Sequence, residues 1–99
     1  IVVGADNDDV LTAWSRQDGK VLWKNETFKH RNLSAPLVAG DSIVIGDSQG
    51  YVHILSASNG TLRNRVRIDE SPIQTAPVLA GNTVVIATSK GTVAGLNLQ

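Results

Sequence analysis

Two histidines are the side chains in this sequence best suited to acid–base chemistry or to holding a transition metal. A hydrolase would need a nucleophile, a base and an orienting acid that converge. His30 falls in an expected exposed loop beside Arg31, a cation that opposes metal binding, and His53 falls in an expected strand. We expect His53 to be a packed residue whose ring nitrogens bond to backbone or hydroxyl groups. With two separated histidines and no cysteine, the sequence predicts no catalytic residues, no metal site and no cofactor.

The acidic run Asp6-Asn7-Asp8-Asp9 is the best candidate for a calcium site, because Ca²⁺ prefers oxygen ligands. A loop of the EF-hand kind needs oxygen ligands at its first, third and fifth positions, followed by glycine. Counting from Asp6, the fifth position is Val10, so the pattern fails. We therefore expect this run to form a solvated turn between two strands.

The composition excludes several classes of protein. Nine Lys and Arg balance nine Asp and Glu, whereas binding to nucleic acid or to an anionic membrane surface requires a basic excess. The 41% of hydrophobic residues is too high for a disordered chain, and no apolar run approaches the roughly 18 residues of a membrane span. The stretch from Ile1 to Gly4 reads as part of a strand with no initiator methionine, so we expect a piece of a longer protein.

A repeat of 41 residues organises the elements that must position these side chains. The segment from Ser34 to Gly46 recurs, without a gap, from Thr75 to Ala87. A third, partial copy lies upstream, where Gly19 corresponds to Gly60 at the same offset. The stretch from Ile1 to Gly4 matches the stretch ending at Gly46 at an offset of 42, which predicts one residue gained in the intervening loop.

Short apolar runs separated by turn residues make up each unit. β-branched residues fill the runs, and Gly and Asn supply the positive φ angles of tight turns. Helical periodicity is absent, so each unit is predicted to form four short antiparallel strands, which is typical of one β-propeller blade. The strands expected in the complete unit, named A to D from the inside outward, cover residues 37–39, 42–46, 51–57 and 61–68.

The middle and outer strands differ in polarity. The segments 43–45 and 52–55 are apolar on both faces, which is expected for blades stacked against neighbours on either side. In the outer strand, Arg63, Arg65 and Arg67 point one way. We expect them to form a solvated edge that discourages aggregation; an anionic docking stripe is the alternative.

The length sets the expected organisation. Ninety-nine residues make about 2.4 blades, whereas a closed propeller needs about four to eight. The prediction is an all-β β-propeller fragment: a partial blade at 1–33 (strands B–D), a complete blade at 34–74, and a partial C-terminal blade at 75–99 (strands A–C). Open blade faces and unpaired strand edges at both ends predict that the isolated chain self-associates.

The stretch from Ala13 to Trp23 resembles the blade motif of quinoprotein-type propellers, Ala-x-Asp-x-x-Thr-Gly-x-x-x-Trp. Ala13, Gly19 and Trp23 match the motif, and two of its other positions differ. In that family the tryptophan docks between adjacent blades, which implies a docking role for Trp23, Gly19 and Gly60. The next unit has Asn64 where the tryptophan would stand, so weaker docking is implied there.

A closer resemblance is to the BamB family of outer-membrane protein assembly factors. It rests on the segments 30–36 and 45–53, which resemble the penultimate blade of that family, and on 74–77 and 90–93, which resemble its last blade. It implies an eight-bladed propeller at the periplasmic face of the outer membrane of a Gram-negative bacterium, attached through an N-terminal lipid anchor upstream of this sequence. It further implies a non-enzymatic scaffold whose partners are the periplasmic domains of the barrel-forming subunit BamA and unfolded outer-membrane proteins.

Two alternatives remain open at this point. Quinone (PQQ)-dependent dehydrogenases share the propeller, and they resemble one another in a calcium-bound cofactor on the axis and an adjacent-cysteine pair. A generic adaptor or lectin propeller is the third class. A lipoprotein cysteine in the full-length sequence would favour the scaffold, and a Cys-Cys pair would favour the enzyme.

Antiparallel strand order indicates where a partner would bind. The B–C and D–A loops must lie at one end of the blades and the A–B and C–D turns at the other. The first group is longer and chemically richer, and binding residues concentrate on such loops. The residues predicted to contact a partner are His30, Arg31, Asp47, Gln49, Asp69, Glu70 and Gln74.

Overall fold

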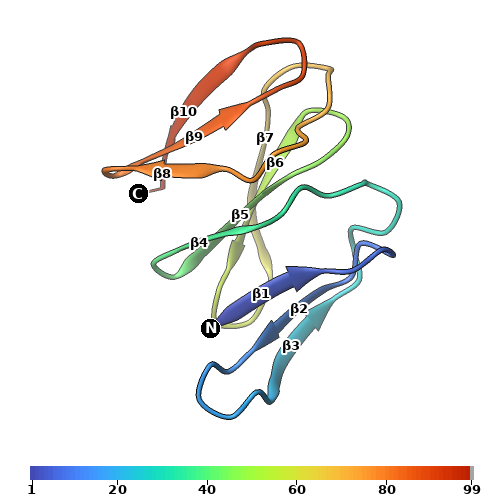
Figure 1. Cartoon of the computed structure of the whole chain (residues 1–99), viewed down its shortest axis with the longest axis vertical. Helices are drawn as coiled ribbons and strands as arrows, with labels where there is room; N and C mark the ends of the chain where they lie inside the picture. The colour runs from blue at the N-terminus through green and yellow to red at the C-terminus, as the bar shows by residue number, and fades with distance from the viewer. Residues whose placement is uncertain (99) are drawn as a thin grey trace.

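The computed structural model describes residues 1–98 and contains three antiparallel β-sheets that follow one another along the chain (Figure 1). The first sheet contains β1 (Val2–Ala5), β2 (Leu11–Trp14) and β3 (Val21–Asn25). The central sheet contains β4 (Leu37–Ala39), β5 (Ser42–Gly46), β6 (Tyr51–Ser56) and β7 (Leu62–Arg67). The third sheet contains β8 (Val78–Ala80), β9 (Thr83–Ala87) and β10 (Val93–Asn97). In every sheet the strands lie in sequence order, and Gln99, the last residue of the third predicted unit, lies outside the described residues.

Strand pairing shows that all three sheets share one register. The pair Val3–Ala13 in the first sheet corresponds to Val44–Ile54 in the central sheet, an offset of 41 residues at both positions. The predicted offset of 42 for the first strand was therefore wrong, and no residue is gained in the loop that follows it. Residues 43–46 resemble residues 1–4 in type more closely than residues 42–45 do, so a comparison of residue types favoured the offset of 42. A shift of one residue, however, would turn every side chain to the opposite face of the sheet.

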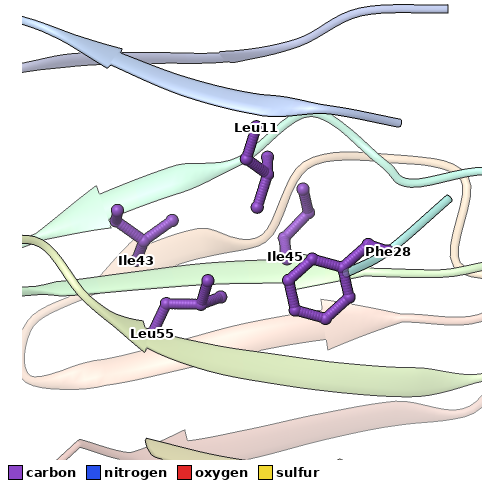
Figure 2. Close-up of a cluster of buried hydrophobic side chains, with 5 residues drawn as sticks. All are labelled: Leu11, Phe28, Ile43, Ile45 and Leu55. Atoms are coloured by element: carbon purple, nitrogen blue, oxygen red, sulfur yellow. The ribbon is translucent and has the colours of Figure 1, made fainter. Parts of the chain in front are cut away.

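The first hydrophobic core lies between the first and central sheets. Figure 2 shows Leu11 of β2 pointing toward Ile43, Ile45 and Leu55 of the central sheet, with Phe28 from the β3–β4 connection beside them. All five side chains are at most 1% exposed. Burial of apolar side chains stabilises the contact between the two sheets by about 25 cal/mol per Å² of apolar surface removed from water.

The second core lies between the central and third sheets. Val44 and Val52 of the central sheet pack with Val84 and Ile86 of β9 and with Ile73 of the β7–β8 connection. Because neighbouring residues of β5 point in opposite directions, this strand contributes to both cores. The prediction that the middle strands are apolar because both faces are covered is confirmed.

The outer faces of the two end sheets are more exposed. Val21 of β3 is 52% exposed, and Val78 and Val93 of the third sheet are 61% and 68% exposed. Within residues 1–98 the structure contains no helix long and apolar enough to cross a membrane.

The three arginines of β7 are exposed, as expected for a solvated edge, and they also bond to other residues of the central sheet. Arg63 donates to the Ser42 hydroxyl, and Arg67 lies 5.0 Å from the centre of the Tyr51 ring. Arg65 donates through Nε to His53 Nδ1 at 3.2 Å. The strand ends at Arg67, and Asn64 uses its side-chain oxygen to accept the backbone N–H of Arg65.

Candidate protein-binding surface

The loops predicted to share one end of the sheets are joined there by hydrogen bonds. In the β5–β6 loop, Ser48 donates through its backbone N and its hydroxyl to the Arg31 carbonyl of the β3–β4 connection, at 3.0 and 2.9 Å. One repeat later, Ser89 N donates to the Pro72 carbonyl at 2.9 Å. We call this end, formed by residues 6–10, 26–36, 47–50, 68–77 and 88–92, the loop surface.

The β1–β2, β5–β6 and β9–β10 loops of this surface are each held by a side chain at the first position of the loop. The Asp6 carboxylate accepts the backbone N–H groups of Asp8 and Val10, and the Asp47 carboxylate accepts those of Gln49 and Tyr51 at 2.9 and 3.0 Å. Thr88 holds the same place in the third repeat and accepts through its hydroxyl. Such bonds satisfy backbone donors that the loop leaves unpaired, and they fix its shape.

Asp9 departs from the repeat in a way that links two loops. Its repeat equivalents, Gly50 and Gly91, have φ angles of 83° and 98°, and Asp9 adopts a φ of 61° without being glycine. Its carboxylate accepts the backbone N–H groups of Asn32 and Leu33 at 3.1 and 3.0 Å. Asp9 is only 8% exposed, so the expectation of a solvated turn was wrong at this residue.

The carboxylates of Asp6 and Asp9 are thus occupied by backbone donors. Within residues 1–98 no group of three or more His, Asp or Glu side chains is arranged to hold a metal ion.

A buried charged network lies directly beneath the loop surface. Asp47 and His53 are both fully buried, and Asp47 Oδ2 lies 2.8 Å from His53 Nε2. The same oxygen accepts a bond from Arg31 Nη1 at 3.2 Å. The expected backbone or hydroxyl partners of His53 were wrong, because its ring nitrogens bond to Asp47 and Arg65. Asp47, one of the residues predicted to contact a partner, has a carboxylate with no exposed surface.

Both buried groups have shifted pKa values. Burial lowers the pKa of His53 below its ordinary value, although the hydrogen bond to Asp47 opposes the shift. Burial raises the pKa of Asp47, but hydrogen bonds from His53, Gln49 and Tyr51 outweigh it, so the net shift is downward. A neutral His53 beside an ionised Asp47 follows at neutral pH.

The other predicted contact residues differ in their exposure. His30, Gln49, Glu70 and Gln74 are exposed, and Glu70 forms an ion pair with Lys90. Arg31 is half-buried through its bond to Asp47.

Asp69 is half-buried as well. Hydrogen bonds from Ser71 and Thr88 hold the pKa of its carboxyl well below the ordinary value. Asp69 and Arg31 therefore shape the loop surface as much as they present charge to it.

The residues predicted to dock one blade on the next divide into two groups. The Trp23 side chain of β3 packs against the central sheet, and its Nε1 donates to the Ala57 carbonyl at 2.9 Å. A β carbon at Gly60 would lie 2.4 Å from the Trp23 ring, and Asn25 donates to the Gly60 carbonyl at 2.7 Å. Gly19 holds the equivalent place one repeat earlier, but among the described residues nothing lies within 4 Å of a β carbon built there. The contact between the first and central sheets therefore does not involve Gly19, whose positive φ of 71° serves the β2–β3 turn.

The sequence did not predict the groove that lies between the first sheet, the β3–β4 connection and the β7–β8 connection. It has a volume of about 820 Å³ and is lined by the β1–β2 loop, residues 32–36 and residues 72–74. Asp9 and Ser48 form part of its wall. One feature of the sequence could have pointed to this groove: Asp9 stands in a repeat position where the other two units have glycine.

Comparison with known proteins places the chain in a family. A family model described as outer membrane protein assembly factor BamB matches residues 7–99. The chain belongs to the BamB family.

Two curated BamB relatives show the similarity in sequence. The protein of Burkholderia pseudomallei is 44% identical over 76 residues, or 77% of this chain and 20% of that protein. The protein of Legionella pneumophila is 40% identical over 63 residues, or 64% of this chain and 16% of that protein. The matched segments therefore span about a fifth or less of these two curated BamB proteins.

A solved structure shows the same similarity in three dimensions. The chain superimposes on the crystal structure of BamB from Moraxella catarrhalis with a TM-score of 0.88 and 27% sequence identity. The match covers 98% of this chain and 29% of that chain. The three antiparallel sheets thus have the arrangement found in part of a BamB structure.

Proposed function

We propose that this chain is part of a non-enzymatic scaffold subunit of the outer-membrane β-barrel assembly machinery, located at the periplasmic face of the outer membrane of a Gram-negative bacterium. The observation that carries the proposal is the match of residues 7–99 to the BamB family. Attachment to the membrane is through an N-terminal lipid anchor that lies outside this sequence.

The scaffold is an eight-bladed propeller, and this chain supplies about 2.4 of its blades. Residues 1–33 are strands B–D of one blade, 34–74 a complete blade, and 75–99 strands A–C of the last. Support comes from the sheets of three, four and three strands and from their shared 41-residue register.

The partners are the periplasmic domains of BamA and, transiently, unfolded outer-membrane proteins. The loop surface is the contact region, since it carries exposed polar side chains on loops that hydrogen bonds hold in place. Of the residues singled out from the sequence, His30, Gln49, Glu70 and Gln74 contact the partner directly. Arg31 and Asp69 act mainly by holding the loops, and Asp47 supports them from beneath.

Affinity purification of the intact protein from envelope extract tests the proposal. We expect BamA and other outer-membrane assembly components to be recovered with it. Recovery of quinone-linked dehydrogenase activity, dependent on added PQQ and Ca²⁺ and without BamA, would favour the enzyme alternative and overturn the scaffold proposal.

A further inference from the structure

His53 is a buried titratable residue that the proposed scaffold role does not use. Its Nε2 lies 2.8 Å from Asp47 Oδ2 and its Nδ1 accepts from Arg65 Nε at 3.2 Å. A guanidinium is a donor only, so Nδ1 must carry a lone pair and the ring proton must sit on Nε2, pointing at Asp47. Both nitrogens of a neutral imidazole are thereby committed.

We propose that His53 is an acid-sensitive latch that holds the outer strand β7 to β6 and opens when the ring takes up a proton. The proton comes from solvent and adds to Nδ1, where it replaces the lone pair that accepts from Arg65. Two donors then face each other across 3.2 Å, and two positive charges lie side by side. Arg65 must turn away, and β7 loses this side-chain bond to β6, while the backbone pairing and the contact between Arg67 and the Tyr51 ring remain.

The groups around the ring determine which contact breaks. Asp47 from the β5–β6 loop gains attraction for an imidazolium, so its bond to Nε2 persists. Arg31 from the β3–β4 connection is held by the same Asp47 oxygen and adds positive charge on that side. Phe28 and Tyr51 close the two sides of the ring, with ring centres 4.8 and 6.3 Å away. Among these charged neighbours Arg65 is exposed, whereas Arg31 is half-buried and Asp47 is buried, so Arg65 has the most room to move into solvent.

The sign of the pH dependence follows from the shift. Because the pKa of His53 in the folded protein lies below its ordinary value of about 6.5, the neutral ring is the form that folding favours. The contribution to stability is complete above that value and is lost as the pH falls through and below it. Asp47, whose pKa is also lowered, remains ionised throughout this range.

Proton NMR of the intact protein, with histidine labelled at Cε1 and arginine at Nε, tests the latch directly. The His53 signal is assigned by its loss in His53→Gln. We expect its titration midpoint to lie below 6.5, and the Arg65 Nε–H signal to shift with the same midpoint. In Arg65→Ala the midpoint of His53 should rise by about one pH unit, since a facing donor and a positive charge are removed. Arg63→Ala, on the same face of β7 but bonded to Ser42, should leave it unchanged.

Amide exchange of β7, corrected for the intrinsic pH dependence, gives the second measurement. Protection of β7 should fall at least several-fold across the His53 titration. It should stay constant in His53→Gln, where the amide oxygen accepts from Arg65, the amide nitrogen donates to Asp47, and neither titrates. The proposal is overturned if Arg65→Ala leaves the His53 midpoint unchanged, or if His53 titrates without a change at Arg65 or in β7.

Discussion

Single carboxylates in the loop surface act as clamps on the backbone, and Asp9 is the clearest case. Its two oxygens accept neighbouring N–H groups of the β3–β4 connection, and its backbone adopts a conformation that costs a non-glycine residue about 1 kcal/mol or more. Glycine stands in the equivalent place in the other two repeats. The two hydrogen bonds that the Asp9 carboxylate accepts offset the cost of this backbone conformation.

Replacing Asp9 separates the bonds from the backbone strain. Asp9→Ala should destabilise the intact protein by about 1–3 kcal/mol, because two backbone donors lose their acceptor and the strain remains. Asp9→Gly loses the same bonds but relieves the strain, so it should be less harmful by about 1 kcal/mol. Urea unfolding measures both. Equal stabilities of the wild type and Asp9→Ala would show that the bonds contribute nothing.

At the scale of elements, one specific contact between the first and central sheets is made by an aromatic ring and a glycine. Trp23 covers Gly60 so closely that a β carbon has no room, and its indole N–H is satisfied by the Ala57 carbonyl. The first and central sheets therefore associate through a defined contact as well as through the apolar core.

Two substitutions test this contact. Trp23→Ala should cost about 3 kcal/mol, the lower end for a large aromatic because the ring is half-buried. Gly60→Ala should cost clearly more than Gly40→Ala, since φ is positive at both glycines but the space around Gly40 is open.

The double variant gives the decisive comparison for this contact. Once Trp23 is removed, Gly60→Ala should cost no more than Gly40→Ala, because the clash has gone and the two effects are coupled. Chemical denaturation of the four variants measures the coupling. Strict additivity would mean that Trp23 and Gly60 do not touch.

Turn residues and alternating apolar residues were enough to predict the strands and the burial of both faces of the central sheet. The register of the first strand could not be predicted in this way. Residue types favour an offset of 42, and only the strand pairing shows that the offset is 41. The site was harder to predict than the fold. Asp47 and His53 stand six residues apart, one in a loop and one in a strand, and nothing local indicates that their side chains meet under the surface. Loop position alone suggested that Asp47 was exposed.

On the scale of the whole molecule, the chain has two covered sheet interfaces and two open end faces. Val21 on one end sheet and Val93 on the other are more than half exposed, and the outer edges of the end sheets offer backbone groups for pairing. In the proposed propeller these faces meet further blades.

The isolated 99-residue chain should therefore associate with itself. Light scattering after size-exclusion chromatography should give a mass above 10.5 kDa that rises with concentration. A folded monomer of 10.5 kDa at every concentration would contradict the expectation that these faces need a neighbour.

Binding of a protein partner at the loop surface can be tested by site-specific photo-cross-linking of the intact protein in the cell envelope. Gln49 and Gln74 are exposed on the loop surface. Asn82, which is also exposed, lies in the β8–β9 turn at the opposite end of the sheets and serves as the matched control. A photoreactive residue at position 49 or 74 should form a cross-link to the periplasmic domains of BamA, and one at position 82 should form none. Cross-links to BamA from position 82 alone, or equal yields from both ends, would show that the loop surface is not the contact region.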